Sequence, residues 1–131
     1  MKTNSFVLVR EKAHVVELED DKEVFGEVEE ITSRAVGAER VNVAKVTLWG
    51  PDILHYHKEA EETYICLEGE GELFIDGQIF KFVPGIRAII RPGVVHAARP
   101  KQKLGRVVFL CVASPAFSPD DVFEDSRGRI W

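Results

Sequence analysis

Two histidines stand one residue apart in the stretch HYHKEAEE, which covers residues 55–62. The chain has only 4 histidines, so the pair His55 and His57 is a local concentration. In a β-strand, residues i and i+2 point to the same face, which would bring the two imidazoles together. A third histidine, His96, follows the turn sequence Pro92-Gly93 and would arrive from a separate hairpin.

Side chains of these types, brought to one point, would form a metal site. Three neutral imidazoles and one carboxylate suit a divalent first-row transition metal and leave one or two coordination positions for water or substrate. Glu62, five residues after His57, can supply the carboxylate, because it opens the apolar stretch TYICL and its oxygen can reach back. Mn, Fe, Co, Ni, Cu and Zn all accept such ligands, so the pattern leaves the metal open.

Short apolar segments rich in β-branched residues predict the strands that would position these ligands. These segments are residues 41–49, 63–67, 72–76, 78–83, 86–90 and 106–113. Asp76-Gly77 between two of them predicts a hairpin with a type I′ turn, because both central residues of that turn need positive φ. Turns at intervals of roughly 8 to 12 residues are typical of an antiparallel sandwich or barrel.

The two ends of the chain differ in composition from the short apolar segments of the middle. The N-terminal third carries scattered apolar residues and predicts further strands separated by the acidic turn EDDK. From Pro115 onward, prolines and aromatic residues predict an extended segment on the outside of the barrel or across a dimer, and not a second domain. Helix patterns are weak, with at most one turn at residues 58–62. The basic group at residues 99–106 is interpreted as a solvated loop.

The spacing of the histidines resembles the two sequence motifs of the cupin superfamily. Residues 50–69, GPDILHYHKEAEETYICLEG, resemble the first motif, G-x5-H-x-H-x3,4-E-x6-G. Residues 85–96, GIRAIIRPGVVH, resemble the second, G-x5-P-x-G-x2-H-x3-N. Fifteen residues separate the motifs, as in small microbial cupins. The resemblance covers residues 50–100, and both motifs occur in the right order.

Three positions depart from the cupin pattern. Gly50 stands one residue closer to His55 than the first motif asks, Arg91 replaces the proline of the second motif, and Pro100 replaces its closing asparagine. None of the three is a ligand position in the motifs. The departures therefore concern the local turn geometry and leave the ligand set in place.

The resemblance implies an all-β fold, a double-stranded β-helix or jelly-roll barrel of antiparallel strands, formed by residues 1–131 as one domain. It implies that the metal ligands are His55, His57, Glu62 and His96. Glu61 is the alternative carboxylate, because the first motif permits a gap of three, but Glu62 leaves the six residues to Gly69 that the motif requires. His14 falls in neither motif and is interpreted as a non-ligand. Family habit and the aromatic tail predict a homodimer.

Several functions fit such a site, because one fold hosts many chemistries. Residues 55–77 resemble mannose-6-phosphate isomerase-like cupin domains, which implies isomerisation or epimerisation of a sugar, a sugar phosphate or a similar oxygen-rich metabolite. Tyr64 shares the strand face of Glu62 and is the candidate catalytic residue, with a place in the barrel core as its alternative role. A decarboxylase, a dioxygenase and a non-catalytic metabolite- or metal-binding protein remain open.

Composition and charge limit the kinds of binding partner and the cellular location that we expect for the protein. The chain has 131 residues, of which 45% are hydrophobic and 30% charged, as in ordinary globular domains. A net charge of −5, with 22 acidic and 17 basic residues, argues against nucleic-acid binding. No apolar run approaches the roughly 20 residues that span a bilayer, so we expect a cytoplasmic protein without a membrane partner. Cys66 and Cys111 lie in apolar stretches and are interpreted as reduced, buried thiols.

Overall fold

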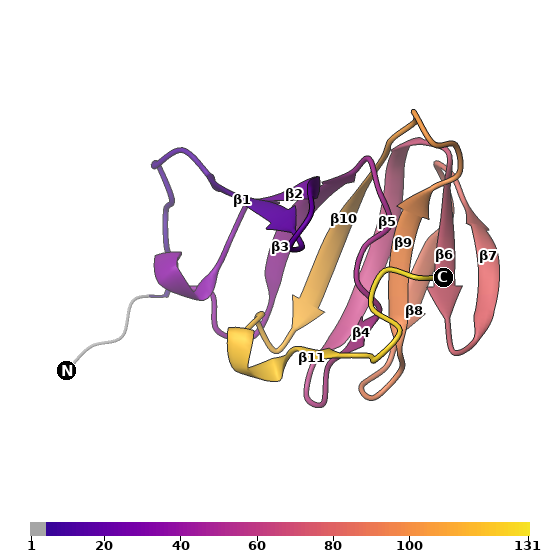
Figure 1. The fold of residues 1–131 in the computed structure, drawn as a ribbon. Coiled ribbons are helices and arrows are strands. Elements are labelled where there is room, and N and C mark those ends of the chain that lie inside the picture. Colours follow the sequence, from indigo (N-terminus) through magenta and orange to yellow (C-terminus); the bar gives the residue numbers. More distant parts are fainter. Residues whose placement is uncertain (1–4) are drawn as a thin grey trace.

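The computed structural model describes residues 5–131 and consists of two antiparallel β-sheets that enclose the core (Figure 1). One sheet has six strands in the order β1-β2-β3-β10-β5-β8, and the other has five in the order β11-β4-β9-β6-β7. Several neighbouring strands are distant in sequence, as in β10 between β3 and β5. The expected all-β double-stranded β-helix is therefore confirmed.

The strands are short, and their bounds are as follows. The six-stranded sheet contains β1 (His14–Glu19), β2 (Val24–Glu30), β3 (Asn42–Leu48), β5 (Glu61–Gly69), β8 (Arg87–Ile90) and β10 (Val107–Ser114). The five-stranded sheet contains β4 (His55–Tyr56), β6 (Gly71–Ile75), β7 (Gln78–Phe82), β9 (His96–Pro100) and β11 (Phe123–Glu124). Two 3-10 helices, η1 (Arg34–Val36) and η2 (Pro119–Asp121), complete the elements of the described chain. None of its helices is long and apolar enough to cross a membrane.

The apolar segments seen in the sequence form the strands that they predict. All six correspond to β3, β5, β6, β7, β8 and β10, with ends that agree to within two residues. The acidic turn joins β1 to β2, where the Asp20 carboxylate accepts the backbone N–H groups of Lys22 and Glu23, each at 2.9 Å. Asp76 and Gly77 have φ of 50° and 84° and join β6 to β7, as the hairpin prediction requires.

No apolar segment of the sequence predicted β4, β9 and β11 of the smaller sheet, although a strand was expected at His55 and His57, of which β4 includes only His55. Two of them have only two residues, and β9 reads HAARP, without alternation of apolar and polar residues. Residues 99–106 were interpreted as a solvated loop, which is wrong at its start. Arg99 lies in β9, where its guanidinium pairs with Glu72 at 3.0 Å and stacks on the Trp131 ring.

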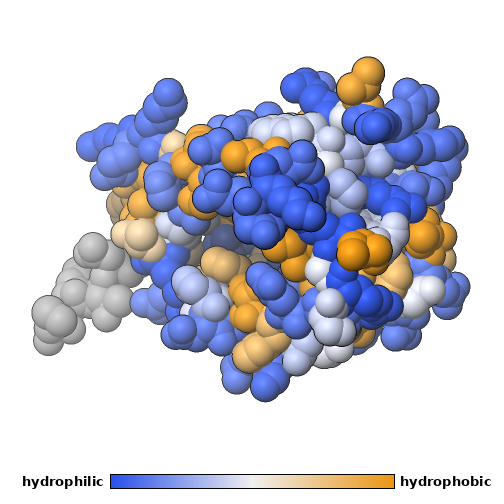
Figure 2. All heavy atoms as spheres, in the orientation of Figure 1, coloured by the Kyte–Doolittle hydropathy of each residue, from blue (hydrophilic) through white to orange (hydrophobic). Residues whose placement is uncertain are grey.

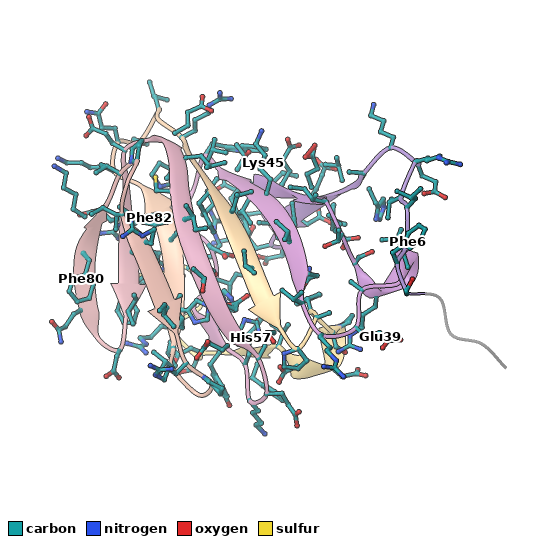
Figure 3. All side chains as sticks on the ribbon, turned by 180° about the vertical axis from the view of Figure 1, so that it is seen from behind. Phe6, Glu39, Lys45, His57, Phe80 and Phe82 are labelled. Atoms are coloured by element: carbon teal, nitrogen blue, oxygen red, sulfur yellow. The ribbon has the colours of Figure 1, made fainter. Side chains whose placement is uncertain are left out.

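The core lies between the two sheets. Along β5, the inward positions Glu62, Tyr64 and Cys66 are 5%, 4% and 3% exposed, which confirms the phase expected for this strand. Strand β7, at the edge of the smaller sheet, does not alternate in this way: only Phe82 at its end is buried, whereas Phe80, two residues earlier on the same strand face, is 47% exposed (Figure 3). The sequence left the places of these phenylalanines open, and the structure assigns Phe82 to the core and Phe80 to the exposed part of the edge strand.

The C-terminal tail is placed differently from the expectation. It contains an extended part, but β11 pairs with β4, through Phe123 opposite Tyr56 and Glu124 opposite His55. The tail is therefore an edge of the smaller sheet, next to the paired histidines, and not a segment on the outside of the barrel. Lys58 covers the Phe123 ring, with its Nζ 4.2 Å from the ring centroid. The edge position follows from backbone pairing, which composition does not reveal.

Candidate metal centre

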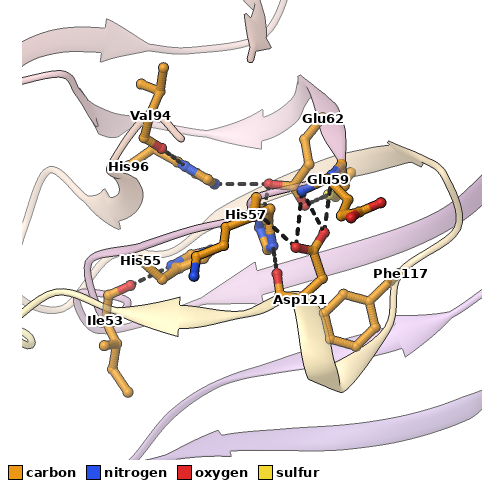
Figure 4. A network of polar contacts seen from close by, with 12 residues as sticks. Ile53, His55, His57, Glu59, Glu62, Val94, His96, Phe117 and Asp121 are labelled. Atoms are coloured by element: carbon orange, nitrogen blue, oxygen red, sulfur yellow. Dashed lines mark hydrogen bonds and ion pairs between the residues drawn. The ribbon is translucent and has the colours of Figure 1, made fainter. Parts of the chain in front are cut away.

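Four side chains from the two sheets meet at one point. His55, His57, Glu62 and His96 each offer one ligand atom, and these atoms all lie within 4.8 Å of one another. His55 in β4 and His96 in β9 are direct neighbours in register, while Glu62 reaches the same point from β5 of the facing sheet. His57 follows β4 immediately. The group could hold a metal ion, as the sequence predicts (Figure 4).

Each imidazole is oriented by a backbone carbonyl that faces its Nδ1 atom. The partners are Ile53 O for His55 at 2.6 Å, Asp121 O for His57 at 2.7 Å and Val94 O for His96 at 2.9 Å. A carbonyl oxygen only accepts, so Nδ1 carries the proton and donates it. In the neutral imidazole, Nε2 then bears a lone pair that is available to a metal.

The inner faces of these groups suit a cation. Nε2 of His96 lies 2.8 Å and Nε2 of His57 lies 2.9 Å from Glu62 Oε1. With the Nδ1 protons fixed by carbonyls, both neutral rings would face the carboxylate with lone pairs, which repel unless a proton or a metal stands among them. Within the described chain, His57 Nε2 is also buried without a partner in hydrogen-bonding geometry. The donor set therefore fits a divalent cation.

Burial and mutual pairing shift the pKa values of the group in opposite directions. Burial alone would raise the pKa of the Glu62 carboxyl, but its bonds to His57 and His96 hold that pKa far below the usual range. Burial would lower the pKa of His57, yet Glu62 and Asp121 raise it above 6.5. For His55, burial dominates and lowers the pKa. The carboxylate is thus kept ionised at neutral pH.

The structure separates the two carboxylates that the sequence offered. Glu62 points inward and joins the histidines, whereas Glu61 points outward and pairs with Arg91 at 2.8 Å. Arg91 stands where the cupin pattern has a proline. Arg91 therefore gives Glu61 a partner at the surface, and this difference from the cupin pattern leaves the ligand cluster unchanged.

Asp121 holds the segment that carries His57. Its carboxylate accepts the backbone N–H groups of Lys58, Glu59 and Ala60 at 2.8, 3.0 and 3.0 Å, while its own carbonyl accepts from His57 Nδ1. Burial would raise the pKa of Asp121, but the three N–H bonds lower it, so the carboxylate stays charged. Asp121 thus fixes both the His57 ring and the loop that follows it, although Asp121 and His57 are 64 positions apart in the sequence.

Gly93 fixes the same segment from the other side. Its φ is 84°, in the left-handed region that favours glycine, and its N–H donates to the His57 carbonyl at 2.6 Å. The turn that leads into β9 and His96 is therefore bonded to the backbone of His57. The two histidines are positioned by one connection, although 39 residues separate them in the sequence.

Cys111 lies against the second oxygen of Glu62. Its Sγ is 3.0 Å from Glu62 Oε2, and the residue lines the pocket beside the cluster. Burial and the nearby Glu62 charge raise the pKa of the thiol well above its ordinary value, so the thiol stays protonated and donates. The sequence predicted a buried thiol here, whereas Cys111 is half-buried, and its contact with Glu62 was not predicted. Cys66, in contrast, lies in the core cluster as expected.

A pocket of about 330 Å³ opens beside the four ligands. Figure 2 shows a hollow in this face, with apolar residues at its margin. Tyr64 and Asp52 line the pocket together with His55, His57 and Glu62. Burial raises the pKa of Tyr64 well above 10 and also raises that of Asp52. Tyr64, the candidate catalytic residue, thus lies in the pocket wall as a neutral phenol.

Comparison with known proteins places the chain in a family. The family model of the cupin domain matches residues 43–113. The chain is a member of the cupin family. An uncharacterized protein of Aquifex aeolicus (strain VF5) is 34% identical to it over 102 residues, which are 76% of this chain and 82% of that protein.

Solved structures share the cupin fold at low sequence identity. A crystal structure of a protein from Planctomyces limnophilus has a TM-score of 0.72 and 18% identity, and covers 91% of this chain and 97% of its own. Streptomyces Pac13, described as a unique nucleoside dehydratase, has a TM-score of 0.66 and 14% identity, with coverage of 89% and 92%. At this identity the likeness shows the fold alone.

Three residues near the ligands of this cupin escaped the sequence analysis. Asp52 stands inside the first motif, but at a position that the motif leaves free. Cys111 reads as one more apolar residue of β10. Asp121 lies 59 residues beyond Glu62, and its only signal is the sequence Ser-Pro-Asp-Asp, which starts the short helix η2. Backbone pairing of β11 with β4 brings it to the site.

Replacing Asp121 tests its role in holding His57. We expect Asp121→Ala to weaken binding of a divalent metal by about 10- to 100-fold, as is typical when a group that orients a ligand is removed. The adjacent Asp120→Ala is the matched control and should leave affinity unchanged, because its side chain is exposed. The measurement is titration against a chromophoric chelator. Equal affinity in the two variants would contradict the role of Asp121.

Metal affinity should depend on pH in two stages. The metal competes with protons, and His57, whose pKa is raised above 6.5, charges before His55 as pH falls. His55, whose pKa is lowered, charges only below 6.5. We therefore expect the apparent affinity to be constant at high pH, to fall by about tenfold per pH unit once His57 takes up a proton above 6.5, and to fall more steeply below 6.5, where His55 does so too. An affinity unchanged from pH 7.5 to 5.5 would exclude histidine ligation.

Proposed function

We propose that this cupin is a metal-dependent enzyme that moves protons on a small metabolite with two neighbouring oxygen atoms. The observation that carries the proposal is the convergence of three imidazoles and one carboxylate within 4.8 Å at the side of a 330 Å³ pocket. When bound there, a divalent metal would chelate the two oxygens and stabilise negative charge that develops on them. His55, His57, Glu62 and His96 are the proposed ligands.

Two pocket residues support proton transfer as the reaction. Tyr64 stays a neutral phenol, because burial raises its pKa, and it can donate a hydrogen bond or a proton to a substrate oxygen. Asp52 is half-buried, and desolvation raises its pKa, which makes it a better proton acceptor than an exposed carboxylate. Its backbone is fixed by bonds to Ala98 and to the Trp131 indole. Tyr64 and Asp52 are therefore the proposed proton carriers of an isomerase-like reaction.

A sugar phosphate, one of the substrates that the sequence suggested, does not suit this pocket. Within residues 5–131, no lysine or arginine lines the pocket. A phosphate dianion needs charge-assisted donors, such as arginine or lysine. The proposal therefore concerns a hydroxy-carbonyl compound without a phosphate group.

Elemental analysis tests the metal part of the proposal. Purified wild-type protein should hold about one divalent transition metal per chain after dialysis, because the four ligands form a single site. His57→Ala should hold less than a tenth of that amount under the same conditions. His14→Ala is the control, because His14 lies on the exposed strand β1 and pairs only with Glu30 at 3.5 Å. Equal metal content in wild type and His57→Ala would refute the site.

Proton exchange tests the catalytic part. Metal-loaded wild type should exchange the protons next to the carbonyl of 2-hydroxyacetophenone, an uncharged α-hydroxyketone, for deuterium in D₂O, as followed by NMR. Tyr64→Phe should retain the metal and slow this exchange by about 10²- to 10⁴-fold, the usual contribution of a positioned acid or base. Tyr56→Phe is the control, because Tyr56 stacks on Phe123 outside the pocket lining. Tight binding without any exchange would instead indicate a non-catalytic binding protein.

A further inference from the structure

The pocket next to the four ligands continues as a trough along the inner face of the six-stranded sheet. Cross-strand neighbours form a row of apolar side chains, in which Val16 is paired with Val28, Val28 with Val46, and Val46 with Phe109. All of these residues line the pocket. The row crosses four strands, which at about 4.8 Å between strands corresponds to a length of roughly 14 Å.

Small side chains connect this row to the ligand cluster. Glu62 is opposite Ala113, and one row further along, Cys111 is opposite Ala44. Both alanines line the pocket. Because an alanine fills little of the space above the sheet, the volume beside Glu62 is continuous with the volume above Val46. The site therefore has a chelating end and an apolar end.

The charge of the lining favours some ligands over others. Its ionisable residues other than histidine are acidic, namely Glu30, Asp52, Glu62 and Glu124, together with the phenol Tyr64 and the thiol Cys111. Within the described chain, no lysine or arginine joins them. A ligand with a phosphate or a second carboxylate would meet only like charges away from the metal. The net charge of −5 acts in the same direction at long range.

Polyhydroxylated ligands are disfavoured for a different reason. Asn42, a polar residue of the lining, is already engaged, since its oxygen accepts the Phe117 N–H at 2.8 Å and its nitrogen donates to the Thr32 carbonyl at 3.3 Å. Along the row from Val16 to Phe109 the side chains offer sugar hydroxyls no hydrogen-bond partner, and burying an unpaired hydroxyl is unfavourable. Methylene or aromatic carbons, in contrast, gain from contact with the valine row.

We infer that the site takes an uncharged, largely apolar molecule with a chelating pair of oxygens at one end, whose hydrocarbon part lies along Val46, Val28 and Val16. This inference rests on the proposed metal-dependent function and specifies its substrate class. The occupant of the apolar trough is a small ligand, because the trough is continuous with the metal-ligand cluster and the pocket volume of about 330 Å³ suits a small molecule.

A series of hydroxamic acids tests the inference, because each carries the same bidentate head, which is neutral in solution and loses one proton when it chelates a metal. Calorimetric titration of metal-loaded protein would compare acetohydroxamate, hexanohydroxamate and octanohydroxamate. Each buried methylene should tighten binding about three- to fourfold. We expect octanohydroxamate to bind at least about 30-fold more tightly than acetohydroxamate. Phosphoglycolohydroxamate, which adds a phosphate to the same head, should bind more weakly than acetohydroxamate.

Two variants locate the hydrocarbon part. Ala44→Leu should abolish the dependence on chain length while acetohydroxamate binding is kept, because the larger side chain fills the passage between the cluster and the valine row. Lys45→Leu, on the neighbouring exposed position of β3, is the matched control. Val28→Lys, at a half-buried position of the trough, should weaken octanohydroxamate and strengthen phosphoglycolohydroxamate.

The outcomes separate this inference from the proposed function. If the protein binds its metal and acetohydroxamate, but chain length has no effect or the phosphate compound binds most tightly, the inference is wrong and the metal-dependent function stands. If the wild type binds no metal, both are wrong. If Ala44→Leu binds octanohydroxamate as tightly as the wild type does, the hydrocarbon part of the ligand lies outside the valine row, and the inference is also wrong.

Discussion

A buried carboxylate that faces imidazole nitrogens is the interaction on which the rest of this structure depends. Glu62 is 5% exposed and comes from one sheet, while the histidines that face it, with a proton or a metal among them, come from the other sheet and the loop after β4. An ionised carboxylate without such partners would be strongly unfavourable in this position. The two sheets must therefore meet in one register, and the same register assembles a set of atoms that fits a metal.

Backbone groups supply much of the precision at this centre. Carbonyl oxygens of Ile53, Val94 and Asp121 fix the three imidazole rings, and the N–H of Gly93 ties the β9 turn to His57. These bonds leave the Nε2 atoms directed at one another. Because the bonds belong to strands and turns, the ligand geometry is a property of the fold itself. The side chain of Asp121 adds to this by holding the loop after His57.

The division of the pocket into a polar and an apolar end also follows from sheet register. On the inner face of the larger sheet, each row of cross-strand neighbours has its own character: Glu62 with Ala113 in one, Tyr64 with Cys111 in the next, and Phe109 with Val46 beyond. In the proposed reaction, a substrate that chelates at the first row would meet Tyr64 in the next row and apolar carbon further along. The proposed reaction and the proposed substrate class thus depend on different rows of one surface.

The sequence by itself determined the strands with strong β-branched patterns, the hairpin at Asp76-Gly77, and the order in which His55, His57, Glu62 and His96 occur, since these depend on local residue preferences and on motif spacing. Tertiary structure alone decided the rest. The motif spacing favours Glu62 over Glu61 as the metal ligand, but it does not predict that Glu61 points outward and pairs with Arg91. Asp121, Cys111 and the valine row reach the site only through pairing between distant strands. A linear pattern carries no information on such neighbours, because each strand can pair with several others until the core is packed.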